Sequence, residues 1–225
     1  MIVFLGEGPL AYLCYQEILI RNLMNSFGPY DAVPEGDLLV SVQHHRKVEN
    51  LVIRNFPLTV NLHTGLLPNN KGVNTCSVPI LRGDTQTGVT LHEMTEQLDG
   101  GDIILQAAYP VLPSDTCESL YYKAVSEGQR LFKQFLDLLT PYSHGRINRH
   151  QIQMIQSTKT PQPDGGYRTL RNSIDFNEPI YVDDPLFEKK KRAYFFPQKQ
   201  FPIVVKDHRR LKLVSLLPER YEAVE

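Results

Sequence analysis

Three polar side chains, an amide, an imidazole and a carboxylate, have the chemical character of a site for proton transfer. Asn61 and His63 lie two residues apart at the end of an apolar run, and Asp99 follows 36 residues after His63 (99 − 63 = 36). An imidazole that titrates near neutral pH can take a proton from one reacting group and return it to another. An amide can stabilise an oxyanion, and a carboxylate can orient the imidazole and stabilise its charged form. An Asn-x-His pair alone is usually structural, so this interpretation depends on Asp99 and on the motifs between.

The elements around these residues are typical of a doubly wound α/β domain. Apolar runs at 2–5, 38–42 and 58–62 indicate strands that are buried on both faces of a parallel sheet. A glycine turn and a helix over 10–24 follow the first run, as at the start of such domains. Ligands bind beyond the carboxyl ends of parallel strands, which is where Asn61 and His63 lie. We expect the strand to break near His63.

Further elements are predicted along the rest of the chain. Apolar residues at steps of three and four, or their sums, indicate a long helix over 115–139. A helix is expected to start at Asp184-Pro185, with proline at its first position, and strands at 201–206 and 211–216 read as a β-hairpin. The remaining predictions are helices at 48–53 and 78–81, strands at 88–94 and 102–110, and loops at 25–36, 64–75 and 162–166.

The predicted architecture is therefore a Rossmann-like, mainly parallel sheet, abbreviated in its N-terminal half, with a small C-terminal α+β appendage that contains the hairpin. We predict a catalytic domain over residues 1–145 and a small domain over 146–225 that is a candidate dimerisation region. A chain of 225 residues can bury one full core with such an appendage.

Composition narrows the class of function. The net charge is −1, unlike the basic balance of a protein built mainly to bind nucleic acid. The three cysteines are far apart and indicate neither a disulfide framework nor a metal site, which favours a reducing, cytoplasmic compartment. The N-terminus lacks the features of a signal peptide, and no apolar run is long enough to cross a membrane. We predict no metal, no nucleic acid and no membrane partner.

Residues 37–140 resemble the 10-formyltetrahydrofolate-dependent formyltransferases. The resemblance is carried by Asn61-Leu62-His63, by Leu66-Leu67-Pro68, by the strand-like Gly88–His92 and by Leu98-Asp99 at the family's interval. It implies that Asn61, His63 and Asp99 are catalytic and that 10-formyltetrahydrofolate is the cosubstrate. It also implies a pterin pocket at the segment after the second strand and at the loop before Asp99. The residues predicted to bind folate are Gln43, His44, His45, Arg46, Leu67, Met94, Gln97 and Leu98.

Within this family the chain looks most similar to the sugar-nucleotide formyltransferases. The segment 192–197 with its hairpin, and the pattern Asp115-Thr116-x-x-Ser119-Leu120-Tyr121, resemble that subfamily. The resemblance implies a homodimer that formylates a dTDP-linked sugar, dTDP-4-amino-4,6-dideoxyglucose or a 3-amino 6-deoxyhexose, in glycan or O-antigen biosynthesis. Asn69, Lys71 and Asn74 are the residues predicted to bind this substrate, and Lys can serve as a phosphate partner.

One departure from the family leaves other functions open. One or two βα units are absent between the first helix and the strand that precedes the Asn-x-His strand, which changes the expected folate entrance. A catalytically silent protein that binds folate or a nucleotide is one alternative. An enzyme that hydrolyses formylfolate, or that formylates another acceptor, is a second.

Overall fold

The computed structural model describes residues 1–27, 35–139, 147, 149–170, 173–197 and 199–224. The chain forms two compact units, each assembled from three stretches. The first contains Met1–Lys71, Gly88–Ala108 and Ala124–Tyr167, and the second contains Gly72–Thr87, Tyr109–Lys123 and Arg168–Glu225. The predicted domain boundary after residue 145 stays a prediction.

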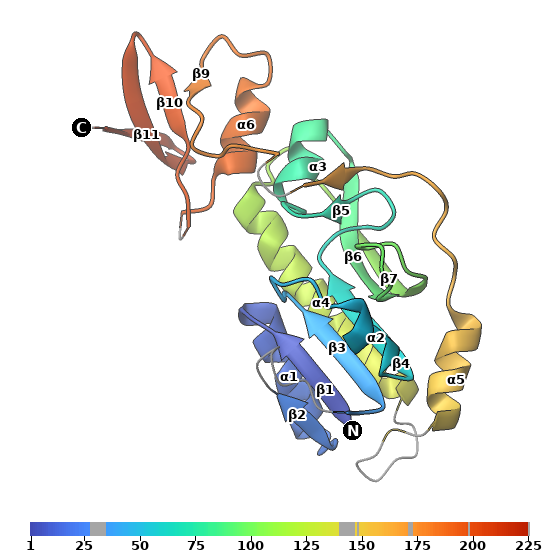
Figure 1. Ribbon diagram of the computed structural model, residues 1–225. Coiled ribbons are helices and arrows are strands. Elements are labelled where there is room, and N and C mark those ends of the chain that lie inside the picture. Colours follow the sequence, from blue (N-terminus) through green and yellow to red (C-terminus); the bar gives the residue numbers. More distant parts are fainter. Residues whose placement is uncertain (28–34, 140–146, 148, 171–172, 198, 225) are drawn as a thin grey trace. The chain divides into compact units, whose positions relative to one another are not determined.

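A six-stranded sheet forms the centre of the first unit (Figure 1). Its order is β2-β1-β3-β4-β6-β7. Strands β1 (Ile2–Gly6), β3 (Leu38–Val42) and β4 (Leu58–His63) are the apolar runs expected from the sequence, and they pair in parallel. β6 (Gln86–Glu93) is antiparallel to β4 and is followed by β7 (Ile103–Pro110). The mainly parallel, doubly wound sheet predicted from the sequence is confirmed.

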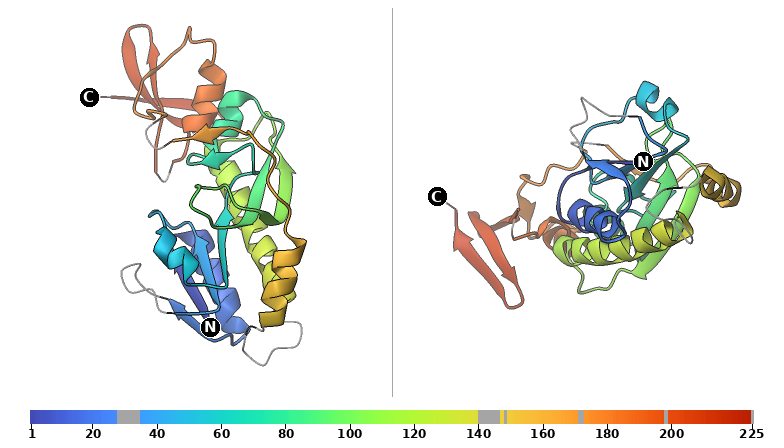
Figure 2. Two further views of the ribbon diagram at one scale, coloured as in Figure 1. Left: turned by 45° about the vertical axis from the view of Figure 1, so that its right-hand side comes forward. Right: turned by 90° about the horizontal axis from the view of Figure 1, so that it is seen from below.

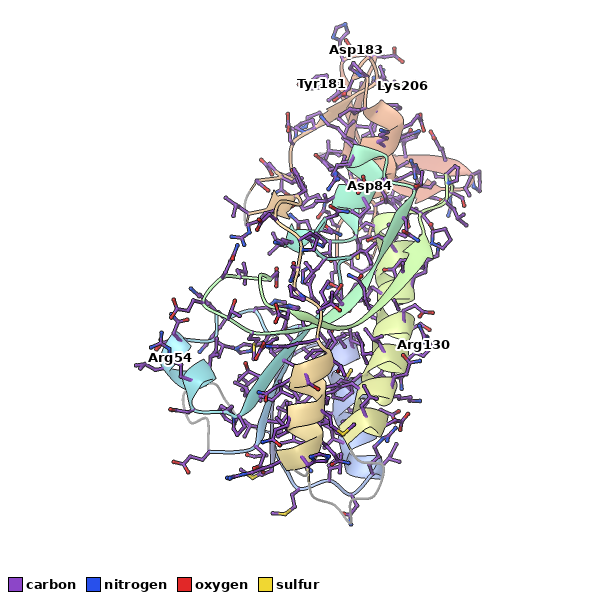
Figure 3. All side chains as sticks on the ribbon, turned by 90° about the vertical axis from the view of Figure 1, so that its right-hand side faces the viewer. Arg54, Asp84, Arg130, Tyr181, Asp183 and Lys206 are labelled. Carbon is purple, nitrogen blue, oxygen red and sulfur yellow. The ribbon has the colours of Figure 1, made fainter. Side chains whose placement is uncertain are left out.

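Helices cover both faces of this sheet. α1 (Pro9–Ile20) and α4 (Cys117–Leu139) lie side by side on one face, and the short α2 (Asn50–Arg54) lies on the other (Figure 2). The labelled side chains of Arg54 on α2 and Arg130 on α4 accordingly project from opposite faces (Figure 3). α5 (Arg149–Thr158) buries Gln151, Ile152 and Ile155. None of the helices in the described ranges is long and apolar enough to cross a membrane.

The first unit departs from the sequence prediction at its sheet edge. Residues 25–36 were expected to form a loop, but Asn25–Phe27 form the edge strand β2, parallel to β1. The first helix ends at Ile20 rather than at residue 24, and this leaves room for the edge strand. A strand this short carries little sequence signal, because the exposed backbone edge of β1 supplies its hydrogen-bond partners.

The second unit contains a small four-stranded sheet of order β12-β11-β10-β9. β10 (Ile203–Lys206) and β11 (Arg209–Leu216) form the expected hairpin, closed by Asp207 and His208, both with positive φ as in two-residue hairpin turns. β9 (Ile180–Tyr181) and β12 (Glu219–Ala223) complete the sheet, and the hairpin core contains Val204, Leu213 and Phe195.

Helix α6 (Phe187–Tyr194) of the second unit packs against α3 (Ser77–Arg82). It begins two residues after the predicted start at Pro185. The Asp184 carboxylate accepts a hydrogen bond from the Leu186 N–H at 2.7 Å, so a turn at Asp184 precedes the helix. The short strands β5 (Lys71–Gly72) and β8 (Arg168–Thr169) were not predicted.

Candidate active site

Strand pairing brings the polar residues of two strands to one face of the first unit's sheet. In the antiparallel β4–β6 pair, Asn61 lies opposite His92 and His63 lies opposite Thr90. Residues two apart on a strand share a face, and directly opposed residues on neighbouring strands are in contact. The expected break at His63 is therefore wrong: β4 stays regular through His63, and this regularity is what places Asn61 and His63 together.

His63 is buried and has one ring nitrogen fixed by the backbone. Its Nε2 lies 2.7 Å from the carbonyl oxygen of Asn70. Because a carbonyl only accepts, Nε2 carries the proton in the neutral ring, and Nδ1 presents its lone pair. Burial lowers the pKa of His63 below its ordinary value, and His92 lowers it further, while Asp99 and the Asn70 carbonyl offset part of this shift. His63 is thus a neutral imidazole near pH 7, with Nδ1 available as a base.

Asn61 is held by His92, which is 2% exposed. His92 Nδ1 donates to the carbonyl of Glu93 at 2.8 Å, so His92 Nε2 accepts from the amide nitrogen of Asn61 at 3.1 Å. An amide nitrogen carries two hydrogens, and the second is not used by this bond. His92 therefore fixes the orientation of Asn61 and leaves it a donor for a developing oxyanion.

Asp99 faces both histidines from the loop between β6 and β7. Its carboxylate Oδ1 lies 3.8 Å from His63 Nδ1 and 3.6 Å from His92 Nε2, and the residue is buried. These distances are too long for hydrogen bonds but place a negative charge where a protonated imidazole would need it. Asp99 has a φ of 51°, an uncommon conformation for a residue with a Cβ atom, and such strain concentrates at functional sites.

The loop after β4 is fixed by Thr90, which is fully buried. The Thr90 hydroxyl donates to the carbonyl of Gly65 at 2.8 Å and accepts from the N–H of Leu67 at 3.1 Å. Gln106 Nε2 bonds the same hydroxyl and the carbonyl of Leu67, each at 2.8 Å. A Cβ atom on Gly65 would lie 2.5 Å from His63 Nε2. Glycine at this position is therefore needed for the His63–Asn70 bond.

The predicted folate residues after β3 lie next to this site, because β3 pairs with β4 and both strands end at the same edge. Gln43 Oε1 accepts from the N–H of Leu10 at 3.0 Å and so caps helix α1. His44 is partly buried, and burial lowers its pKa, with Arg46 and His45 adding to the effect and Glu7 opposing it. His45 and Arg46 are exposed. Their binding roles stay predictions.

The other predicted folate residues have varied surroundings. Leu67 is buried within the Thr90 network, and Met94 packs against an apolar core cluster that includes Val3 and Phe56. The Gln97 carbonyl accepts from the N–H of Gly100 at 3.1 Å. Leu98 is 47% exposed beside Asp99, and it offers an apolar surface to a ligand.

The three residues predicted to bind the acceptor are divided between the two units. Asn69 is exposed and Lys71 is buried, both at the end of the loop after His63. Asn74 belongs to the second unit, where its carbonyl accepts from the N–H groups of Ser77 and Val78. Within the described residues, no cluster of three or more His, Cys, Asp or Glu side chains could hold a metal ion.

His92 was predicted to lie on a strand, but the parts that His92 and Thr90 play in the site were not predicted. The positions of Thr90 and His92 in the site depend on the register of β6 against β4, which the sequence does not reveal. Together the fold and the side chains define a doubly wound α/β protein with an Asn–His–Asp cluster suited to acyl transfer, in which the His and the Asp are buried.

Comparison with known proteins agrees with this class. Residues 31–136 match the sequence profile described as formyl transferase, so this part of the chain is similar to that family. The resemblance seen in the sequence is confirmed. A methionyl-tRNA formyltransferase from Parabacteroides distasonis is 28% identical over 174 residues, which cover 76% of this chain and 52% of the relative. The chain thus spans about half the length of this curated relative.

Solved structures show the same fold. An N-formyltransferase from Helicobacter canadensis, in complex with folinic acid and dTDP-3-aminofucose, superposes with a TM-score of 0.71 at 21% identity. The match covers 95% of this chain and 86% of that one. A 4-N formyltransferase from Francisella tularensis gives a TM-score of 0.71 at 17% identity and covers 100% of this chain and 97% of that one.

Proposed function

We propose that this protein transfers the formyl group of 10-formyltetrahydrofolate to the amine of a nucleotide-linked amino sugar. The observation that carries the proposal is the convergence of Asn61 and His63 on β4 with Asp99 of the loop after β6, with His63 held neutral. A neutral base, an oriented amide donor and a buried carboxylate are the groups that acyl transfer to an amine requires.

In the proposed reaction the amine nitrogen attacks the formyl carbon, and the carbonyl electrons move to oxygen. The Asn61 amide donates to that oxyanion. The Nδ1 atom of His63 takes the proton that the amine loses, and the Asp99 charge stabilises the resulting imidazolium. The bond from the formyl carbon to the folate N10 then breaks, and N10 receives the proton from His63. The products are the formamide and tetrahydrofolate.

The donor set fits a folate cosubstrate. Folate carries a planar pterin ring with polar edges, and backbone groups of the 94–99 loop and the segment after β3 could meet those edges. The half-exposed Leu98 adds an apolar contact for the ring. Gln43, His44, His45 and Arg46 are proposed to line the entrance, and the positive charge of Arg46 suits the acidic tail of folate.

Lys71 supports an acceptor that carries phosphate. Its side chain is 8% exposed, and none of the ion pairs within the described ranges includes it. A buried ammonium is costly without an anionic partner, so a ligand pyrophosphate would suit it. The similar fold of the Helicobacter canadensis enzyme, solved with a dTDP-sugar, and the net charge of −1 also favour a sugar nucleotide over a tRNA. Asn69 and Asn74 are proposed as further contacts.

The curated relatives supply a second candidate acceptor, methionyl-tRNA, because the sequence match is to methionyl-tRNA formyltransferases.

We propose cytoplasmic glycan biosynthesis as the setting and a homodimer as the assembly. Both proposals come from the resemblance to the sugar-nucleotide formyltransferases.

Mass spectrometry of reactions with 10-formyltetrahydrofolate and separate acceptors tests these proposals. The panel contains dTDP-3-amino and dTDP-4-amino 6-deoxysugars and methionyl-tRNA. A gain of one formyl group on one sugar would establish both activity and acceptor, whereas a gain on methionyl-tRNA alone would reject the sugar. Loss of formylfolate without any acceptor would identify a hydrolase. Tight folate binding without turnover on any acceptor would identify a silent binding protein.

A further inference from the structure

The loop that carries Asp99 is held from outside by the chain that follows helix α5. The loop runs from Met94 to Asp102, between β6 and β7. The segment 159–162, which directly follows α5, contacts this loop through two side chains and one backbone pair. We call it the loop clamp. All of these residues belong to the first unit.

The backbone pair of the loop clamp fixes its register. Thr160 and Ile103 exchange two hydrogen bonds, N–H to carbonyl in each direction, both at 2.8 Å. Ile103 opens β7 directly after the loop, so this bridge adds a short antiparallel contact at the point where the loop ends. The side chains of Lys159 and Gln162 are thereby set at fixed positions along the loop.

Lys159 joins the two ends of the loop. Its Nζ donates to the Glu93 carboxylate and lies 3.3 Å from the Asp102 carboxylate. Burial alone would lower the pKa of Lys159, but the hydrogen bonds and charges of Glu93 and Asp102 outweigh it and leave the pKa raised. Glu93 is also the residue whose carbonyl accepts the hydrogen bond from His92 Nδ1. The ion pairs therefore tie the loop ends to the strand that orients Asn61.

Gln162 is the residue of the loop clamp that bonds to Asp99 itself. Its Nε2 donates to the carbonyl of Asp99 at 3.1 Å and to the carbonyl of Gly101 at 2.5 Å. The two bonds thus hold Asp99, which has positive φ, and Gly101, which packs against the Glu93 carbonyl. Since a strained φ persists only when the surroundings hold it, the two bonds are suited to keep Asp99 in its conformation.

We infer that Gln162 is a positioning residue for the proposed transfer reaction, setting the Asp99 carboxylate toward His63 and His92, with Lys159 holding the ends of the same loop. The expected effect of Gln162 on kcat rests on the proposed function. Its effect on the position of Asp99 does not. Gln162 touches no reacting atom and acts through the backbone of Asp99.

The test compares Gln162→Leu with Gln156→Leu. Gln156 is a matched control, because its Nε2 also donates to a backbone carbonyl, that of Pro57 at 2.7 Å, outside the loop. The first readout is the pKa of the His63 imidazole by NMR, with its signal assigned from its absence in a His63 variant. The groups that face His63 are Asp99, His92 and the Asn70 carbonyl. Displacement of Asp99 should lower this pKa in Gln162→Leu, as in Asp99→Asn, but not in Gln156→Leu.

Two further measurements separate positioning from general stability. Amide exchange over 94–102 should be faster in Gln162→Leu only. The value of kcat should fall roughly 10- to 100-fold, with a smaller change in KM, because a displaced catalytic group loses alignment. In the Asp99→Asn background, Gln162→Leu should add almost nothing to the loss in kcat, whereas an independent structural role would give additive losses.

Gln162→Asn, which keeps the amide but shortens the side chain, replaces Gln162→Leu if the latter does not fold. An unchanged His63 pKa and unchanged exchange would overturn the inference, whatever the activity. Absence of transfer by the wild type would reject the proposed function alone, because the NMR and exchange measurements need no acceptor.

Discussion

Two strand pairs in the same sheet differ in what they bury. In the parallel β1–β3 pair the central positions are apolar except for Ser41, and the pair forms core. In the antiparallel β4–β6 pair, Asn61, His63, Thr90 and His92 are placed at facing positions. Buried polar groups are tolerated when each has a partner: the register pairs Asn61 with His92, while His63 and Thr90 bond to carbonyl groups of the loop after β4. The comparison teaches that the register itself, more than any single residue, makes the candidate active site.

The largest expected difference between the two pairs is catalytic. His63→Ala on β4 should reduce kcat by about 10³-fold, within the range of general acid–base catalysis, and largely spare folate binding. Gln43→Ala, directly after β3, should weaken folate binding but leave kcat near the wild-type value at saturating folate, since Gln43 caps α1 and is proposed to line the folate entrance rather than to touch the reacting atoms. Single-turnover kinetics and folate titration would measure both variants. Unchanged turnover in His63→Ala would contradict the proposed mechanism.

Glycines in the two regions offer a matched stability comparison. A Cβ atom at Gly65 would lie 2.4 Å from the Asn70 carbonyl oxygen, and one at Gly6 would lie 2.7 Å from the Val42 carbonyl oxygen. Each change to alanine should cost about 1–3 kcal/mol of unfolding free energy through overpacking. Only Gly65→Ala should also reduce transfer by the folded protein, because it displaces His63.

Denaturant unfolding with activity per folded molecule would check this contrast. Equal specific activity in Gly6→Ala and Gly65→Ala would contradict it.

The burial of His63 predicts a pH dependence of stability. Its folded pKa lies below the ordinary value of 6.5, which it keeps in the unfolded chain. The unfolded state therefore binds the proton first as the pH falls through 6.5, and the folded state loses stability until the folded pKa is reached. His63→Asn should lose less stability than the wild type on going from about pH 7.5 to about 5.5.

Urea unfolding at several pH values would measure these slopes. The exposed His208, changed to Asn, serves as a control that should keep the wild-type slope. A wild-type slope in His63→Asn as well would show that His63 is not the group responsible.

The smallest effect is expected at the Arg54–Glu96 ion pair, which joins α2 to the Asp99 loop. The two side chains are 70% and 63% exposed, so solvent screens their attraction. Arg54→Ala should change the unfolding free energy by less than about 0.5 kcal/mol and leave kcat unchanged. A loss of activity here would mean that the loop is held from the α2 side as well as by the loop clamp.

Much of the fold could be predicted because its central strands are short, apolar and punctuated by glycine. β1, β3 and β4 and the hairpin of the second unit were expected within one or two residues. Helix α5 was missed, since Ile152 and Ile155 are the only apolar residues it buries and much of the rest is glutamine. Such a helix is defined by tertiary contacts rather than by its own periodicity.

The candidate site residues could likewise be predicted from the sequence, but the contacts between them could not. Asn61, His63 and Asp99 were predicted from their types, their spacing and the resemblance of the surrounding motifs to a family. Neither the hydrogen bond between Asn61 and His92 nor the contact of Gln162 with the Asp99 backbone had a local signal. Both link segments that meet only after folding.

The loop clamp also sets an order of events during synthesis. Asp99 and Gln162 are separated by 63 residues (162 − 99 = 63), so the ribosome adds Gln162 roughly 3–13 seconds after Asp99 at ordinary elongation rates. During that interval β4 and β6 can pair while the Asp99 loop lacks its outer support. The nascent chain therefore acquires its sheet before its complete candidate active site, and a product released before residue 162 would carry all three proposed catalytic residues with one of them unsupported.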